Sequence, residues 1–192
     1  MLILASASPR RQELLKLITK DFSVICSDTD ERTIEESFDD PDIRNLPVML
    51  AAAKARDVFD KAAMTDAVVI GADTSVICEN RIMGKPSSKE EAREMLTFLS
   101  GKVHQVVTGV CIKTAKTEET FFEESLVRFH DLDAYQKELI ERYISTDDPY
   151  DKAGAYGIQN GGALLVQSVS GDYFNIVGLP VAKLSRSLYP LI

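Results

Sequence analysis

The sequence has few of the residues that build histidine-rich metal centres or disulfide frameworks. Two histidines in 192 residues, His104 and His130, are too few for a metal site made mainly of histidine. The three cysteines, Cys26, Cys78 and Cys111, are odd in number, widely spaced and embedded in β-like runs. This pattern is typical of buried thiols in a reducing compartment, and it argues against both disulfides and cysteine metal ligands.

Long apolar runs and a surplus of positive charge are also missing. No apolar segment is long enough to cross a bilayer, and no basic stretch precedes a long apolar one at the N-terminus, so we expect neither a membrane partner nor a secretory signal. The net charge of −8 makes general electrostatic binding to a nucleic acid polymer unfavourable. A small polyanion could still bind where basic side chains are concentrated or where a divalent cation helps.

The N-terminal segment Leu2–Leu17 predicts a short strand, a loop of small residues and then a helix. Ser8 is suited to cap that helix, and Pro9 fits its first position. Arg10 and Arg11 then fall in the first turn, where a helix normally favours acidic residues. Two arginines are understandable there if an anion such as a phosphate binds beside them. The alternative interpretation is a solvated basic helix start.

An aspartate interrupts an apolar stretch in the middle of the chain. The segment Ala67–Gly71 has the composition of a buried strand, Asp73 follows it, and a β pattern resumes over Ser75–Cys78. A carboxylate at such a place is costly to bury unless it is paired, hydrogen-bonded or bound to a cation. A functional role is therefore favoured over the alternative, a turn aspartate that caps its own backbone.

The remaining pattern is that of a mixed α/β protein, which we expect to form two lobes around a cleft. Taken alone, Lys54 is typical of a surface lysine, and His104 is typical of a structural histidine at a strand end. Residues 27–36 are interpreted as a solvated acidic loop, and the irregular, glycine-rich tract 145–162 is long enough to be functional. The predicted helices are 48–61, 88–99, 134–144 and a last one from about 180 to 189; the predicted strands include 22–26, 103–114, 120–130 and 163–169.

Seven short motifs occur in an order that resembles the Maf family of nucleoside triphosphate pyrophosphatases over essentially the whole chain. Each motif alone is weak evidence, whereas the ordered set is specific. The motifs are Ser6-Ala-Ser-Pro-Arg-Arg-Gln-Glu-Leu-Leu15, Lys54-Ala55, Gly71-Ala-Asp-Thr74, Gly84-Lys-Pro86, His104-Gln-Val-Val-Thr-Gly109, Asp151-Lys-Ala-Gly-Ala-Tyr-Gly-Ile-Gln159 and Val177-Gly-Leu-Pro180.

The resemblance implies a fold, a reaction and a setting. The fold would be one Maf-like domain over residues 1–192: an elongated mixed α/β sheet with flanking helices around a central cleft, similar to inosine triphosphatase. The reaction would be hydrolysis of a nucleoside triphosphate to its monophosphate and pyrophosphate, with a divalent metal cation, Mg²⁺ or Mn²⁺. The protein would be cytoplasmic and a homodimer.

The resemblance also assigns residues. It implies Asp73 as the catalytic acid–base residue and an acidic residue at Glu31. Because Mg²⁺ needs oxygen ligands, Glu31 and Asp73 are the candidate metal ligands, and a role of Asp73 mainly as a metal ligand stays open beside its role as a base. The phosphate-binding positions would be Ser8, Arg11, Lys54 and Lys85, with Lys152 a weaker candidate for added positive charge. Arg10, Thr74 and Gln159 are similar to the subgroup that acts on dTTP and UTP, and they would select the base.

Three alternatives remain open at this point. The protein could belong to the sister subgroup that acts on 7-methyl-GTP, which differs at the three selecting positions. It could be a phosphomonoesterase, which would release orthophosphate. It could also be a non-catalytic nucleotide-sensing protein, although a pure binder has no need of a carboxylate such as Asp73 beside the phosphates.

Overall fold

A mixed sheet of seven strands lies at the centre of the fold in the computed structural model, which describes residues 1–192. The strands follow the order β2-β1-β3-β5-β6-β7, with β4 paired to β3. β1 runs parallel to β2 and β3, whereas β4 and β7 run antiparallel to β3 and β6. The strands are β1 (Leu2–Ala5), β2 (Ser23–Val24), β3 (Val68–Cys78), β4 (Arg81–Met83), β5 (Val103–Lys113), β6 (Glu118–Phe129) and β7 (Val166–Ser170).

Seven α-helices accompany the sheet, which confirms the prediction of a mixed α/β fold with flanking helices. Short 3₁₀ turns cover Ile43–Asn45, Asp148–Asp151, Ala153–Ala155 and Gly161–Leu165. None of the helices combines the length and the apolar character needed to cross a bilayer. The helices are α1 (Pro9–Leu15), α2 (Glu31–Glu36), α3 (Leu46–Ala62), α4 (Lys89–Leu99), α5 (Ala134–Tyr143), α6 (Tyr173–Val177) and α7 (Val181–Leu188).

The chain divides into two compact units. The first contains Met1–Thr74, Thr108–Glu123 and Gly178–Ile192, and the second contains Ser75–Val107 and Glu124–Val177. Three boundaries fall inside the strands β3, β5 and β6, and the fourth follows the end of α6 at Val177. One domain over the whole chain stays a prediction.

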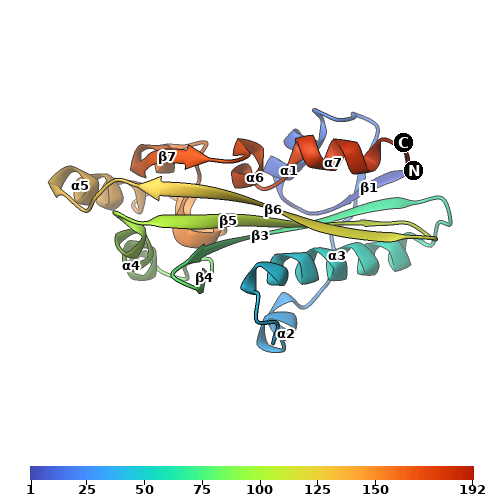
Figure 1. Ribbon diagram of the computed structural model, residues 1–192, viewed down its shortest axis with the longest axis horizontal. Coiled ribbons are helices and arrows are strands. Elements are labelled where there is room, and N and C mark those ends of the chain that lie inside the picture. Colours follow the sequence, from blue (N-terminus) through green and yellow to red (C-terminus); the bar gives the residue numbers. More distant parts are fainter. The chain divides into compact units, whose positions relative to one another are not determined.

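The core of the first unit forms where α3 packs on its strands. Ala51, Ala55 and Val58 of α3 are fully buried against Ile3 of β1 and Val69 of β3. Figure 1 shows α3 on one side of these strands and α1 with α7 on the other. Helices on both faces explain why β1 and the first half of β3 are nearly continuous apolar runs.

The core of the second unit combines helix and strand residues around three rings. Leu96 of α4 and Ile140 of α5 are buried in the same cluster as Phe129 of β6. The rings of His104, Phe129 and Tyr156 stack edge to face in this cluster, with centroids 4.8 to 5.5 Å apart. The prediction of His104 as a structural residue agrees with its burial.

Two of the three cysteines are buried as predicted, and one is not. Cys78 and Cys111 are buried, and burial raises the pKa of the Cys111 thiol to about 12. Cys26 is exposed, so the prediction of a buried thiol is wrong there. Cys26 follows β2, a two-residue strand at the edge of the sheet whose own residues are exposed.

Candidate active site

Lys54 of α3 lies between two carboxylates. Its Nζ is 2.6 Å from Oδ1 of Asp73 and 2.9 Å from Oε1 of Glu31. The side chains of Lys54 and Asp73 are 11% and 15% exposed, whereas that of Glu31 is 43% exposed. A cation this well shielded from water interacts more strongly with its partners than one on the open surface. Three residues predicted for the site therefore meet at one place in the first unit.

A glycine brings α3 close enough for this contact. A Cβ added at Gly71 would lie 2.0 Å from the carbonyl oxygen of Ala51, so no other residue fits without moving the helix. Ala51 precedes Lys54 by almost one helical turn, and Gly71 precedes Asp73 by two strand positions. Those spacings keep each pair on one face of its element. The close approach at Gly71 therefore sets Lys54 against Asp73.

The site lies at the end of a parallel strand. Ala5, the last residue of β1, pairs with Gly71 of β3, so Asp73 and Thr74 extend just beyond the carboxyl end of β1. In open α/β sheets this edge is where ligands generally bind. Because successive side chains of a strand alternate between its faces, Asp73 faces α3 while Thr74 faces the opposite side.

Arg11 connects several segments on that opposite side. Its Nε donates to the carbonyl of Gly178 at 2.8 Å, its Nη2 to the hydroxyl of Thr74 at 3.0 Å and its Nη1 to the hydroxyl of Ser6 at 3.4 Å. The Thr74 hydroxyl is in turn 2.9 Å from that of Thr108. These bonds hold the guanidinium in one orientation beside the loop between β1 and α1.

The electrostatic environment of Arg11 links the two faces. Burial lowers the pKa of its guanidinium, and the neighbouring Arg10 lowers it further, while the carboxylates of Asp73 and Glu31 oppose the shift. An arginine stays protonated in spite of such a shift. The charges of Arg11, Asp73 and Glu31 therefore act on one another, although Arg11 and Asp73 do not bond directly.

Ser8 and Arg10 complete the group in the first unit. Ser8 caps α1, with its hydroxyl accepting from the backbone N–H of Arg11 at 3.5 Å, as predicted. Arg10 lies in the first turn of α1 and is partly exposed.

Lys85 and Gln159 belong to the second unit. Both are exposed, Lys85 just after β4 and Gln159 in the glycine-rich tract. Lys152 is in the same tract but is buried, and its Nζ donates to Asp148 at 3.1 Å and Asp151 at 2.6 Å. The charge of Lys152 is thus already balanced within the tract, which weakens it as a phosphate ligand.

Three residues of the hydrogen-bond network received no role from the sequence. Ser6, Thr108 and Gly178 each contact Arg11 or its partner Thr74. All three lie inside motifs of the family resemblance, and this membership is the sequence feature that could have identified them. Gly178 has a φ of +123°, a conformation that glycine adopts far more readily than other residues.

The carboxylates of Glu31 and Asp73 suit a divalent cation that draws its other ligands from elsewhere. No group of three or more histidine, cysteine, aspartate or glutamate side chains in the chain is arranged so that it could hold a metal ion. Glu31 and Asp73 alone supply two hard oxygen ligands, both drawn to one ammonium. Mg²⁺ is commonly held by one or two carboxylates together with substrate phosphates and water. This donor set suits such an ion and lacks the ligands of a closed structural site.

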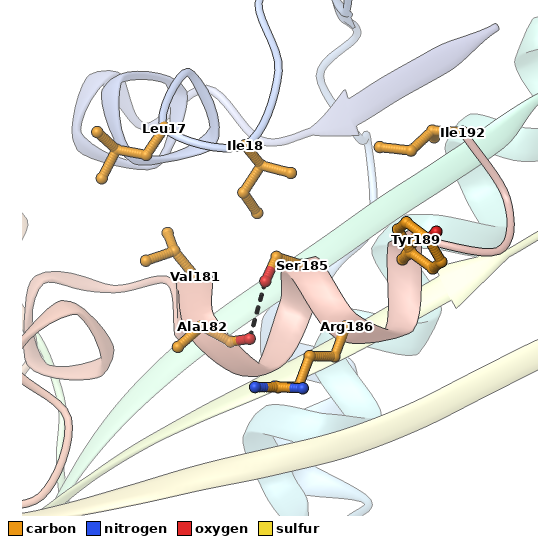
Figure 2. Close-up of a pocket in the computed structure, with 8 residues that line it drawn as sticks. All are labelled: Leu17, Ile18, Val181, Ala182, Ser185, Arg186, Tyr189 and Ile192. Carbon is orange, nitrogen blue, oxygen red and sulfur yellow. Dashed lines mark hydrogen bonds between the residues drawn. The ribbon is translucent and has the colours of Figure 1, made fainter.

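A pocket in the first unit lies away from these residues. It has a volume of about 710 Å³, and in Figure 2 Leu17 and Ile18 face Val181 and Ser185 of α7 across it. Its lining is mainly apolar, with Arg186 as its one charged side chain. None of the predicted site residues lines it, and a mainly apolar lining with a single arginine does not suit a triphosphate.

Comparison with known proteins places the chain in a family. A sequence model described as Maf-like protein matches residues 1–191. A Bacillus velezensis protein named dTTP/UTP pyrophosphatase is 47% identical over 187 residues, which are 97% of this chain and 94% of that protein. Proteins of the same name from Bacillus cereus and Bacillus anthracis are 43% and 44% identical over 97% of this chain and 93% of theirs. The chain therefore belongs to the Maf family.

Proposed function

We propose that this protein hydrolyses dTTP and UTP to the monophosphate and pyrophosphate at the site built around Lys54 and Asp73. The observation that carries the proposal is the shielded contact between these two residues at the carboxyl end of β1. Membership of the Maf family and relatives named dTTP/UTP pyrophosphatase support the reaction and the substrates.

Positive side chains bind the triphosphate. A nucleoside triphosphate carries about four negative charges at neutral pH, so its hydrolysis depends on positioning and on neutralising charge. Arg11 can contact two phosphate oxygens at once, and Lys54 acts as a point charge. Ser8 contributes a hydroxyl, and Lys85 enters the proposal through the family resemblance alone.

Asp73 acts as the acid–base residue. Its Oδ1 accepts a hydrogen bond of 2.6 Å from Nζ of Lys54. When the phosphates take over Lys54, Asp73 is free to accept a proton from the attacking water. The water oxygen forms a bond to the α-phosphorus, the bond from that phosphorus to the bridging oxygen breaks, and pyrophosphate leaves.

Glu31 and Asp73 would hold a divalent cation, Mg²⁺ or Mn²⁺, together with the phosphate oxygens. A bound cation would lower the pKa of water and neutralise phosphate charge, so a weakly basic carboxylate would suffice as the base. The two carboxylates would keep the ion beside Lys54, and their negative charge would offset part of its positive charge.

Arg10, Thr74 and Gln159 select the base in this proposal. Uracil and thymine present an imide N–H between two carbonyl oxygens, and a side-chain amide can donate to and accept from that edge. The Thr74 hydroxyl is oriented by Arg11 and Thr108, which prepares it for one further contact. We also take the enzyme to be a cytoplasmic homodimer, as the family resemblance implies.

A substrate profile tests the proposal against its alternatives. The protein is incubated with Mg²⁺ and dTTP, UTP, CTP, GTP or 7-methyl-GTP, and pyrophosphate and orthophosphate are measured separately. We expect pyrophosphate from dTTP and UTP, with turnover of the other nucleotides lower by at least about tenfold, the effect of one or two lost hydrogen bonds. Preference for 7-methyl-GTP, release of orthophosphate, or binding without turnover would each contradict it.

A further inference from the structure

The tract that carries Gln159 has almost no regular structure of its own. Between α5 and β7 it contains only short 3₁₀ turns, and Gly154 and Ala155 both have positive φ values. Gln159 itself is exposed at the far end of the tract. An amide that recognises a base must be held within a few tenths of an ångström, which such a segment cannot do unaided.

A buried hydrogen bond fixes the tract three residues before Gln159. The hydroxyl of Tyr156 and Nε2 of His104 on β5 share a hydrogen bond of 2.7 Å. The two side chains are 6% and 1% exposed, and both rings pack edge to face against Phe129. Tyr156 is thus attached to the sheet by a bond that water does not reach.

A second tyrosine fixes the next residue. The hydroxyl of Tyr143, at the end of α5, accepts a hydrogen bond of 3.0 Å from the backbone N–H of Gly157 and donates to the carboxylate of Asp148. Tyr143 is 5% exposed, and burial raises the pKa of its hydroxyl, followed by the effect of Asp148. Two consecutive residues, Tyr156 through its side chain and Gly157 through its backbone, are therefore attached to two separate elements of the second unit.

Asp148 gathers the rest of the tract around itself. Its carboxylate accepts from Asn160 at 2.7 Å as well as from Lys152 and Tyr143. Although burial alone would raise the pKa of Asp148, these hydrogen bonds keep it below its usual range. Gln159 therefore lies between Gly157 and Asn160, which are hydrogen-bonded to Tyr143 and Asp148 respectively.

The same tract reaches the segment that carries Lys85. The backbone N–H of Gly154 donates to the carbonyl of Gly84 at 3.0 Å, and a Cβ at Gly154 would lie 3.0 Å from the side chain of Val76. Lys85 follows Gly84 directly. The tract thus fixes one residue proposed for the base and the neighbour of one proposed for the phosphates.

Stability of the core is a poor explanation for the buried polar pair. Nδ1 of His104 has no hydrogen-bond partner, and an unsatisfied buried polar atom destabilises a fold. Two apolar rings of the same shape would avoid that loss, because replacing both partners of a buried hydrogen bond is often neutral or stabilising. A buried polar atom kept at such a cost calls for another explanation.

We propose that Tyr143 and Tyr156, the latter through His104, are positioning residues that hold Gln159 in register with the pyrimidine base. This inference rests on the proposed function, because it takes Gln159 as the group that reads the base. It adds three residues that touch no substrate themselves. Their expected effect is on substrate discrimination rather than on the chemical step.

Phenylalanine variants test this inference. We would measure kcat and KM of Tyr156→Phe and Tyr143→Phe with dTTP and with CTP, together with thermal melting. The preference for dTTP over CTP should fall about threefold to tenfold, the worth of one hydrogen bond, mainly through a higher KM for dTTP. Tyr135→Phe is the matched control, because Tyr135 is 62% exposed on α5, and its kinetics should equal those of the parent protein.

Two substitutions of His104 test whether a hydrogen-bonding side chain at this position restores the preference for dTTP. His104→Gln keeps a group that can donate or accept at the position of Nε2, so it should retain more of the dTTP preference than His104→Leu does. A purely structural role would instead make preference follow melting temperature across all the variants. If Tyr156→Phe fails to fold, Tyr143→Phe and the comparison of the two His104 variants carry the test.

Gln159→Leu separates this inference from the function on which it rests. If the preference for dTTP over CTP is lost in Gln159→Leu and reduced in both tyrosine variants, the inference is supported. Discrimination lost in Gln159→Leu but unchanged in both tyrosine variants overturns the inference alone. An unchanged Gln159→Leu enzyme overturns the base-reading role of Gln159 and the inference with it.

Discussion

The contacts of Lys54 show that the role of a single residue can depend on partners that are distant in the sequence. In the sequence it is a lysine on an amphipathic helix, where a surface position is the ordinary interpretation. Its partners Asp73 and Glu31 are 19 and 23 positions away, so no local pattern marks the contact. The family motifs singled out Lys54, and the coordinates supply the physical reason, which is a shielded ammonium between two carboxylates.

Removal of the Lys54 charge should affect both folding and activity. Lys54→Met removes the shielded ammonium that Asp73 and Glu31 share, which should cost about 3 kcal/mol of unfolding free energy. Turnover of dTTP should fall by at least about a hundredfold, the loss typical of a main electrostatic contact. Urea unfolding and a pyrophosphate assay measure the two effects.

Lys61→Met is the control for that substitution. Lys61 lies on the same helix and pairs with Asp28 and Asp57, but its side chain is 35% exposed. Its loss should leave turnover and melting temperature almost unchanged. Equal losses in the two variants would show that any lysine of α3 matters as much, against the role assigned to Lys54.

His104 should make the protein sensitive to mild acid. Burial lowers its pKa from 6.5 to about 4, so between these values the unfolded chain binds a proton that the folded chain does not. Unfolding free energy therefore rises with pH across this window, and acidification to pH 4.5 should remove about 2 to 3 kcal/mol through this residue. Urea unfolding at pH 7 and pH 4.5 measures it, and His104→Gln should lose less stability over that range than the parent protein.

At the scale of elements, periodicity predicted the long helices and strands and failed for the short ones. Helix α3 was expected at 48–61 and covers Leu46–Ala62, while α4 matches its capping box at Ser88. Helix α2 was interpreted as a loop because none of its residues is buried, so it has no apolar face to detect. Strand β4 and helix α6 have three and five residues, too few for a period to be visible.

The segments that pack against the glycines were another feature that the local sequence could not predict. Gly71 and Gly109 both let α3 approach the sheet, and a Cβ at Gly109 would lie 2.3 Å from the backbone of Pro47. The sequence placed both glycines in motifs without indicating which helix they meet. The contact partners are more than 15 positions away along the chain, so only tertiary structure identifies them.

Substitution of Gly71 should displace α3. Gly71→Ala places a methyl group 2.0 Å from a backbone oxygen of the helix, and overpacking of this kind should cost about 3 kcal/mol. Because the helix must shift, Lys54 should also lose its register with Asp73 and turnover should fall. Gly84→Ala is the stability control, since an added Cβ there meets nothing within 4 Å. Similar melting temperatures for the two variants would contradict this account of the packing.

At the scale of the whole molecule, the sequence indicated two lobes but not their limits. Three of the four boundaries between the two units fall within strands that continue from one unit into the other, so no change of composition marks them. The net charge is −8, and in the resting structure Lys54 and Lys152 are each paired with the protein's own carboxylates. A triphosphate must therefore compete with those carboxylates, which favours its arrival together with a divalent cation.

Metal dependence should follow from that competition. Removal of divalent cations with EDTA should abolish turnover of dTTP, and added Mg²⁺ should restore it. Mg²⁺ alone should barely change the melting temperature, because Glu31 and Asp73 offer only two ligands, whereas Mg²⁺ with a non-hydrolysable dTTP analogue should raise it by several degrees. Full activity in EDTA would contradict the predicted metal site, and a large shift with Mg²⁺ alone would contradict a site completed by the substrate.

The central claim is that Asp73 acts on the α-phosphorus while Lys54 binds phosphate beside it. The most direct measurement is pyrophosphate released from dTTP by Asp73→Asn, a substitution that keeps the shape of the side chain and removes its charge. The account predicts no detectable pyrophosphate from a variant that stays folded and still binds the dTTP analogue. Turnover near that of the parent protein in a folded variant would contradict it.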